Sequence, residues 1–185
     1  MPRYVAFLRA INVGGHTVKM DRLRTLFEEL GLSNVETFIA SGNVLFDAPA
    51  RTNIARLEER IEKHLESALG YGVATFIRPL DSLARAAAEH PFAAGVERGF
   101  RLHVGFLKHQ PSATQHSALM KHAGELEEFH MGERAVYWLC HTGIGESKLT
   151  NATFEKALGC PTTFRNVNTV QRLAAKAPAP KAKRT

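Results

Sequence analysis

The hydrophobic pattern of this chain changes period in the same order twice, and this repeated order restricts the fold more than any other feature. Residues 4–77 show the pattern of a strand, a helix, two short strands, a helix and a strand, and residues 100–164 repeat that order. Apolar runs and apolar alternation indicate strands, whereas apolar residues three and four apart indicate helices. The order is typical of ferredoxin-like units, whose helices cover one face of a sheet. We therefore predict an α+β fold with two ferredoxin-like βαββαβ subdomains packed as one unit.

The expected elements follow from this periodicity and from the turn residues between them. Strands are expected at 4–11, 35–39, 44–46, 73–77, 100–107, 126–130, 135–140 and 162–164. Helices are expected at 20–30, 54–69, 81–90, 111–123, 147–158 and 167–175. The chain is thus divided into a first subdomain at 1–80, a helix and connector at 81–97, a second subdomain with a terminal helix at 98–175, and a tail at 176–185.

The positive charge of the chain is concentrated in the tail. The formal net charge is +6, and residues 176–185 contribute four basic side chains and no acidic one, together with Ala and Pro. This composition predicts disorder for the tail. The remaining chain is nearly balanced in charge, so the basic isoelectric point gives little support for nucleic-acid binding by the folded part.

Cysteine content and apolar runs exclude several other classes of protein. The two cysteines are too few for a disulfide framework, and we expect Cys140 and Cys160 to be structural thiols. No apolar run approaches the ~18 residues of a membrane span, and Arg9 and Asn12 interrupt the N-terminal run, unlike a signal peptide. We therefore expect a cytoplasmic protein that does not bind membranes. The histidines show no metal-ligand spacing, so neither a metal nor a cofactor is expected.

Several sequence segments are similar to one known family. They are RAINVGG at 9–15, VKM at 18–20, IASGNVLF at 39–46, SKLT at 147–150 and TTFRNVNTV at 162–170. On these segments the chain resembles the bacterial DUF1697 family over nearly its whole length except the tail. The resemblance implies an α+β fold of two similar ferredoxin-like subdomains and an uncharacterised biochemical function, so no catalytic residue is carried over. The family usually has glycine where this chain has Ala10 and tryptophan where it has Val167, which removes an aromatic stacking surface.

The first candidate binding residues lie at the end of the first strand. Arg9 shares the parity of apolar residues in a strand expected to be central, and a buried guanidinium requires a carboxylate or a ligand. Asn12 and the glycine pair 14–15 follow in a loop before a helix, where free backbone N–H groups can bind an anion. Alternatively, the glycines form only a turn and Arg9 pairs with an internal acid such as Glu36 or Glu128.

Two further polar groups precede the last two expected helices. Lys148 follows a glycine loop and lies in the first turn of a helix, where a bound anion would favour a cation; alternatively, the serine before it is only an N-cap. Arg165 precedes the last helix, and one interpretation is that it faces Arg9 across a shared anion. In the alternative, Asn166 or Asn168 simply caps that helix.

Ser41 and Asn43 flank the glycine of a tight turn between two short strands. A nucleophilic Ser41 requires a nearby base, which the sequence does not indicate, and a turn role is typical of these residue types. The full set of candidate ligand-binding residues is Arg9, Asn12, Gly14, Gly15, Ser41, Asn43, Lys148, Arg165, Asn166 and Asn168.

These residues favour a protein that binds a small anionic ligand, such as a phosphorylated one, where the two subdomains meet. Two alternatives of other classes stay open. One is an RNA- or DNA-binding module that uses a sheet face and the basic tail. The other is an interaction domain without a ligand, in which every polar motif is a cap or a turn. The sequence indicates no general base, so it leaves open whether the protein is an enzyme, and it also leaves the oligomeric state open.

Overall fold

The protein consists of two four-stranded antiparallel sheets with interleaved helices. The computed structural model describes residues 1–12, 14–39, 41–88, 90–142 and 145–177. The first half contains β1 (Arg3–Leu8), α1 (Met20–Glu28), β2 (Ser33–Phe38), β3 (Asn43–Asp47), α2 (Ile54–Leu69) and β4 (Thr75–Pro79). The second half contains β5 (Arg101–Leu107), α5 (Ala113–Met120), β6 (Glu127–Gly132), β7 (Ala135–Cys140), α6 (Asn151–Leu158), β8 (Thr162–Asn166) and α7 (Val167–Ala174). Two helices, α3 (Leu80–Ala88) and α4 (Ala93–Glu97), connect the halves.

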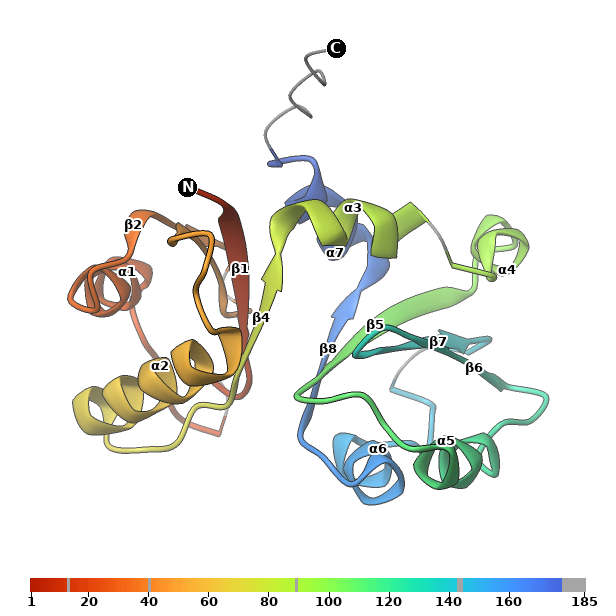
Figure 1. The fold of residues 1–185 in the computed structure, drawn as a ribbon. Helices are drawn as coiled ribbons and strands as arrows, with labels where there is room; N and C mark the ends of the chain where they lie inside the picture. The colour runs from red at the N-terminus through yellow and green to blue at the C-terminus, as the bar shows by residue number, and fades with distance from the viewer. Residues whose placement is uncertain (13, 40, 89, 143–144, 178–185) are drawn as a thin grey trace, which may run out of the picture.

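The two sheets have the same topology. The strand order is β2-β3-β1-β4 in the first sheet and β6-β7-β5-β8 in the second (Figure 1). In each sheet the first strand of the half is central and pairs with the third and the fourth strand. This order is that of the split βαβ unit. The structure thus confirms the predicted α+β fold with two ferredoxin-like units.

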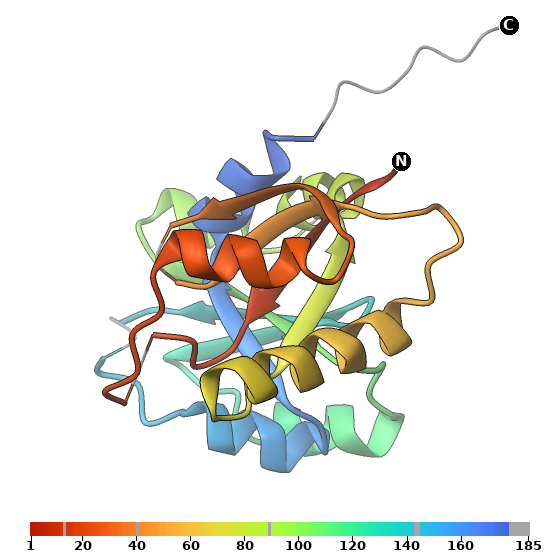
Figure 2. The same ribbon diagram turned by 90° about the vertical axis from the view of Figure 1, so that its left-hand side faces the viewer.

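Three apolar clusters hold the sheets and helices together. The helices α1 and α2 cover the outer face of the first sheet, and α5 and α6 cover the outer face of the second (Figures 1 and 2). The inner faces of both sheets, together with α3 and α7, form one shared core. At its centre the rings of Phe7 and Phe106 stack with their centroids 3.9 Å apart. The two halves therefore pack as one unit around a common core.

The residue pattern of β1 explains how one strand contributes to two cores. Val5 and Phe7 belong to the shared inner core, whereas Ala6 and Leu8 belong to the outer cluster beneath α1 and α2. All four are at most 1% exposed. A strand that is buried on both faces shows a continuous apolar run instead of alternation. This is the pattern that the sequence displays.

Two expected boundaries differ near the start and the middle of the chain. The strand expected at 4–11 ends at Leu8, because Ala10 has φ 62° and turns the backbone into the left-handed region. The expected connector after the helix at 81–90 contains the short helix α4. Neither change alters the order of the strands.

The helix expected at 147–158 begins later than predicted, at Asn151. Thr150 is its N-cap and forms a capping box with the first turn. Ser147 precedes the helix and donates a hydrogen bond to Glu127 Oε1 at 2.5 Å. The serine is therefore engaged by a strand of the sheet instead of capping the helix.

The C-terminal tail expected at 176–185 lies largely outside the described residues, which end at 177. Its first residue, Lys176, forms an ion pair with Glu36, and its Nζ lies 5.4 Å from the centre of the Phe38 ring. Within the described ranges, no helix has the length and apolar character needed to cross a membrane.

Candidate functional site

Each sheet carries one buried arginine on the strand that flanks its central strand. Arg78 of β4 lies opposite Val5 of β1, and Arg165 of β8 lies opposite Val104 of β5. Each side chain hydrogen-bonds to the other half of the molecule, so the arginines mark two equivalent junctions. The Arg165 junction comprises Arg9, Ser41, Asn43, Glu155, Thr163 and Arg165. The Arg78 junction comprises Glu58, Glu62, Arg78, Lys108 and Arg134.

The guanidinium of Arg165 is buried and uses all of its donors within the protein. Nε donates to Asn43 Oδ1 at 2.7 Å, and Nη1 donates to Thr163 Oγ1 at 3.0 Å. Its other acceptors are the carbonyl oxygens of Leu8, Ser41, Phe164 and Gly42, at 2.9, 2.9, 2.8 and 3.4 Å. Burial lowers the pKa of Arg165 to about 10, so the side chain is still cationic at neutral pH. No carboxylate of the described residues pairs with this charge.

A cleft of about 480 Å³ opens beside Arg165. Its lining residues are Leu8, Arg9, Ala10, Ile11, Asn12, Ser41, Asn151, Thr163, Phe164 and Arg165. The structure thus brings four of the sequence candidates together in one cleft: Arg9, Asn12, Ser41 and Arg165. Asn43 does not line the cleft; it is buried and hydrogen-bonded to Arg165.

Arg9 pairs with Glu155 of α6, which belongs to the other half of the molecule. Glu155 also accepts a hydrogen bond from the backbone N–H of Thr162 at 3.0 Å. The suggested partners Glu36 and Glu128 are wrong: Glu36 pairs with basic side chains elsewhere, and Glu128 contacts His141. The sequence did not indicate this pair, because Glu155 looks like an ordinary surface residue of a helix and lies 146 positions from Arg9.

The loop after β1 is held by contacts that do not involve its glycines. Asn12 Oδ1 accepts a hydrogen bond from Val18 N at 2.7 Å, and Tyr71 Oη donates to Ile11 O at 2.9 Å. Gly14 and Gly15 have φ of 65° and 87° and are exposed, with open space where a Cβ would lie. They do not line the cleft, and their backbone conformation is that of a turn.

Three further candidates lie away from the cleft. Lys148 is exposed in the segment before α6. Asn166 caps α7, because its Oδ1 accepts a hydrogen bond from Asn168 N at 2.9 Å, and Asn168 itself is exposed. Asn151, which does line the cleft, was not anticipated, because the helix was expected to begin four residues earlier.

The arrangement at the Arg165 junction is suited to binding oxygen atoms of an anion. The lining includes two guanidinium groups, two hydroxyl groups and two amide groups, with the carboxylate of Glu155 nearby. The Ser41 hydroxyl accepts a hydrogen bond from Asn43 Nδ2 at 2.9 Å, so its O–H can donate outward. An arginine side chain remains protonated, so Arg9 and Arg165 are suited to binding an anion and not to carrying a proton.

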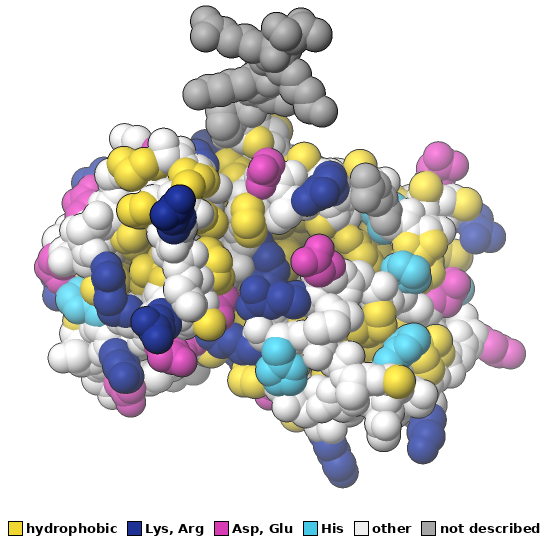
Figure 3. Space-filling model, in the orientation of Figure 1, with side chains coloured by type: hydrophobic (Ala, Val, Ile, Leu, Met, Phe, Trp, Pro, Cys, Tyr) yellow, Lys and Arg dark blue, Asp and Glu magenta, His cyan; other side chains and the backbone are white. Residues whose placement is uncertain are grey.

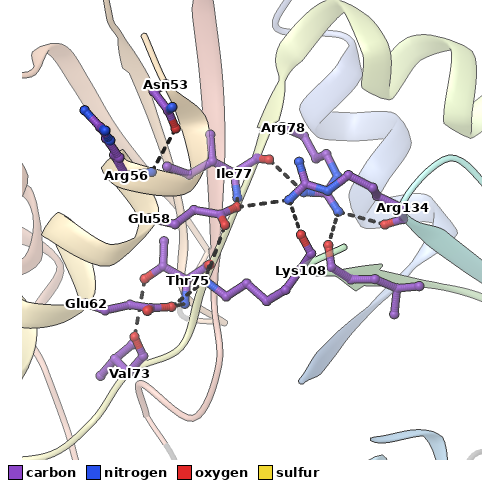
Figure 4. Close-up of polar contacts among 11 residues, drawn as sticks. Asn53, Arg56, Glu58, Glu62, Val73, Thr75, Ile77, Arg78, Lys108 and Arg134 are labelled. Atoms are coloured by element: carbon purple, nitrogen blue, oxygen red, sulfur yellow. Dashed lines mark hydrogen bonds and ion pairs between the residues drawn. The ribbon is translucent and has the colours of Figure 1, made fainter. Parts of the chain in front are cut away.

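The Arg78 junction, which the sequence did not reveal, contains an ionic network (Figure 4). Lys108 Nζ donates to Glu62 Oε1 at 2.6 Å and lies 3.4 Å from Glu58 Oε2. Arg134 lies 3.7 Å from Glu58 Oε1. Arg78 donates to the carbonyl oxygens of Ile77, Leu107 and Arg134 at 2.7, 2.6 and 2.7 Å. Burial and the neighbouring charge of Arg134 lower the pKa of Arg78 to about 10.

Metal-binding and thiol groups are not concentrated at either junction. Among the described residues, no group of three or more His, Cys, Asp and Glu side chains is placed to hold a metal ion. Cys140 and Cys160 are free and buried, and burial raises the pKa of the Cys160 thiol. A raised pKa disfavours the thiolate, which is the reactive form.

Sequence and structure together place this two-sheet α+β protein in a known group. The family model of DUF1697, described as a protein of unknown function, matches residues 1–137. The chain therefore belongs to the DUF1697 family. It is similar to the conserved bacterial protein SP0830 from Streptococcus pneumoniae, with 26% sequence identity and a TM-score of 0.72 over 95% of this chain and 97% of that one. No curated protein matches the chain.

Proposed function

We propose that the protein binds a small oxyanion in the cleft of the Arg165 junction, where the two subdomains meet. The observation that carries this proposal is the buried charge of Arg165, which is 9% exposed and has no carboxylate partner among the described residues. A cation removed from water without a counter-ion costs several kcal/mol. An anion in the adjoining cleft offsets that cost.

The direct contacts to the anion come from residues around Arg165. Its own N–H groups are already used, so Arg165 acts through its charge. Arg9 is partly exposed, with 31% of its side chain accessible, and can share its N–H groups between Glu155 and a ligand. Asn151 lies in the first turn of α6, whose free backbone N–H groups and dipole favour negative charge.

The dimensions of the cleft define the class of ligand. A volume of about 480 Å³ is within the range of small-molecule sites. Ile11 and Phe164 add apolar surface to the polar groups. A phosphorylated or carboxylated small molecule therefore fits better than a polymer that follows an extended surface.

The test is a titration of the full chain with inorganic phosphate, sugar phosphates and nucleotides, followed by calorimetry and by thermal unfolding. A bound ligand at 100 times its Kd adds about 2.7 kcal/mol, which raises the Tm by roughly 5–10 °C for a chain of this length. We expect Arg9→Ala to weaken binding at least tenfold, because it removes a charge-assisted donor.

Lys148→Ala provides the matched control, since it removes one exposed positive charge outside the cleft. Its affinity should equal that of the wild type. The proposal is wrong if no anion in the panel binds, or if both variants weaken binding equally, because the effect would then be one of net charge.

A further inference from the structure

We propose that a second oxyanion site lies on the opposite side of the shared core, in the cleft between α3 and the β6–β7 hairpin. Its ligand is a small organic oxyanion that carries an apolar group. This cleft has a volume of about 490 Å³ and shares no residue with the cleft of the Arg165 junction. The proposal is independent of the function proposed above and involves other residues.

The two buried arginines differ in how many of their N–H groups have a protein acceptor. A guanidinium has five N–H groups, and those of Arg165 all have protein acceptors. Arg78 is 7% exposed and donates through Nη1 once and through Nη2 twice. Within the described parts of the chain, no acceptor contacts its Nε–H or its second Nη1–H. Nε is not among the fully buried unpaired atoms, so this donor faces the cleft that Arg78 lines and is available to a ligand.

The missing acceptors follow from two sequence differences between equivalent positions. Asn43 lies opposite Phe7 in the first sheet, and its Oδ1 accepts from Arg165 Nε. The position opposite Phe106 in the second sheet is Ala135, whose methyl group accepts nothing. Ala135 and Arg78 both line the second cleft. The absent amide therefore leaves the arginine available to a molecule in that cleft.

A second difference in side-chain acceptors lies on the strands that carry the two arginines, β8 and β4. Thr163 lies opposite Phe106, and its Oγ1 accepts from Arg165 Nη1. The equivalent residue opposite Phe7 is Phe76, which has no acceptor. Both side-chain acceptors of Arg165 are thus replaced by apolar groups around Arg78.

The charges around the second cleft favour an anion. Arg78, Arg85 and Arg134 line it, together with one carboxylate, that of Glu133, and Arg134 also lies 3.7 Å from the buried Glu58, so the arginines still outnumber the carboxylates. Arg85 is exposed on α3 and forms no ion pair within the described residues. Figure 3 shows Lys and Arg side chains gathered at the centre of this face of the molecule, where the two halves meet. An excess of positive charge in a partly enclosed cleft raises the local concentration of anions.

The remaining walls define the other part of the ligand. Leu83, Phe106 and Tyr137 belong to the shared core and also line the cleft. A ligand that directs its oxyanion to Arg78 would place its body against these side chains. A phosphate or a carboxylate on an aromatic or aliphatic group has both parts, whereas inorganic phosphate has the oxyanion and lacks the apolar group.

The test measures binding of phenyl phosphate, benzoate and inorganic phosphate to the full chain by calorimetry and by NMR. We expect phenyl phosphate or benzoate to bind at least tenfold more tightly than inorganic phosphate, and the stronger of the two identifies the head group. Ala135→Asn supplies the acceptor that Asn43 provides on the other side. It should weaken binding at least tenfold without lowering the Tm.

Arg85→Glu is the second variant, since Arg85 is exposed and its replacement leaves the core intact. It should also weaken binding at least tenfold. Arg172→Glu is the matched control, because Arg172 is exposed on α7, which packs against α3, and lies outside the cleft. Arg9→Ala separates the two sites, because it weakens any binding of phenyl phosphate at the Arg165 junction and should leave the NMR shifts of the residues that line this second cleft unchanged.

Three results would overturn the proposal. In the first, none of the three probes binds at millimolar concentration. In the second, Arg85→Glu and Arg172→Glu weaken binding equally, which would show attraction by net charge alone. In the third, Ala135→Asn folds with an unchanged Tm and binds the probes as the wild type does, which would show that the free donors of Arg78 are not used.

Discussion

The Arg165 and Arg78 junctions have one backbone plan and differ in how side chains fill it. In the first half, Gly42, the residue before β3, accepts a hydrogen bond at its carbonyl oxygen from Leu8 N at the end of β1. In the second half, Arg134, the residue before β7, accepts one in the same way from Leu107 N at the end of β5. Gly42 and Arg134 both have positive φ, 75° and 49°. A Cβ on Gly42 would lie 2.5 Å from Ile11 Cγ2, so only glycine fits there. Glycine leaves the Arg165 cleft open, whereas the arginine side chain joins the ionic network.

The helices produce the second difference between the junctions. Glu62 of α2 accepts from Thr75 N at 2.7 Å, as Glu155 of α6 does from its own edge strand, so the two glutamates are equivalent. One turn earlier, α2 carries Glu58, which is 3% exposed, and α6 carries Asn151, which is exposed. Glu58 compensates the charges of Lys108 and Arg134 on one side, whereas the corresponding helix position on the other side carries an uncharged amide. Identical topology therefore does not imply identical chemistry.

The largest expected effect separates the two buried arginines. Arg165→Met should lower the free energy of unfolding by about 4 kcal/mol, because it leaves six acceptors without their donors. Arg78→Met should cost about 2 kcal/mol, since three acceptors lose a donor. Urea denaturation measures both. Equal losses would mean that the additional hydrogen bonds of Arg165 add nothing to stability.

The next effect concerns the helix position that distinguishes the junctions. Glu58→Gln should lower the free energy of unfolding by about 2–3 kcal/mol, because it leaves Lys108 and Arg134 with less compensating charge in a buried site. Asn151→Ala changes an exposed side chain and should stay within about 0.5 kcal/mol. Chemical denaturation of the pair tests this expectation. A larger loss for Asn151→Ala would show that the Arg165 junction depends on the amide of Asn151 for its stability.

Steric closure at Gly42 gives an effect of intermediate size. Gly42→Ala should cost about 2–3 kcal/mol, from a left-handed backbone together with a contact to Ile11 that must shift. Gly31→Ala is the matched control, with φ 76° and open space around its Cβ, and should cost about 1 kcal/mol. The difference in Tm between the two variants reports the clash alone. Matching Tm values would contradict a steric role for Gly42.

A smaller effect depends on pH and separates the two central strands. His103 of β5 is equivalent to Tyr4 of β1, and burial lowers the pKa of His103 below its ordinary value of 6.5. The unfolded chain then binds the proton more readily, so stability should fall as pH decreases through 6.5 and be unaffected above it. His103→Phe should reduce this pH dependence of stability. A part of it should remain in the variant, because burial also lowers the pKa of His90. Unfolding measured at pH 8 and at pH 5.5 tests this; an unchanged slope in His103→Phe would contradict it.

The smallest effect is expected at Ala10, whose φ of 62° is unfavourable for a residue with a Cβ. Ala10→Gly should raise the free energy of unfolding by about 0.5 kcal/mol, since relief of this strain exceeds the added entropy of the unfolded chain. Gly14→Ala, with φ 65°, is the reverse change in the same loop and should be destabilising. Thermal unfolding of the two variants should give shifts of opposite sign.

The sequence was sufficient for those elements whose signals are local. The helix expected at 54–69 matches α2 at both ends, because Asn53 caps it by accepting from Arg56 N and Gly70 ends it with φ 81°. The start of α6 was misplaced, because Ser147 has the composition of an N-cap but bonds to Glu127 on a strand. The choice between two capping residues was thus made by a tertiary contact.

The sequence predicted residues of the candidate site only where a charged side chain stood in or beside an apolar strand. Arg9 and Arg165 stand in or beside apolar strands, and their charge alone predicted that each needs a partner. Arg78 also lies within a strand, but its role depends on carbonyl groups of β5 and of the β6–β7 turn. Glu155 and Asn151 look like ordinary helix surface residues, and nothing near them in the sequence indicates a cleft.

The sequence by itself determined the order of the elements, the two similar halves and most helix ends, because periodicity, caps and turns act between neighbours in the chain. Only the tertiary structure decided which side chains meet at each junction. That outcome depends on pairs such as Arg9 with Glu155, which are 146 positions apart, and Asn43 with Arg165, which are 122 apart. Such pairs form only after two sheets have packed face to face, so no local pattern can encode them.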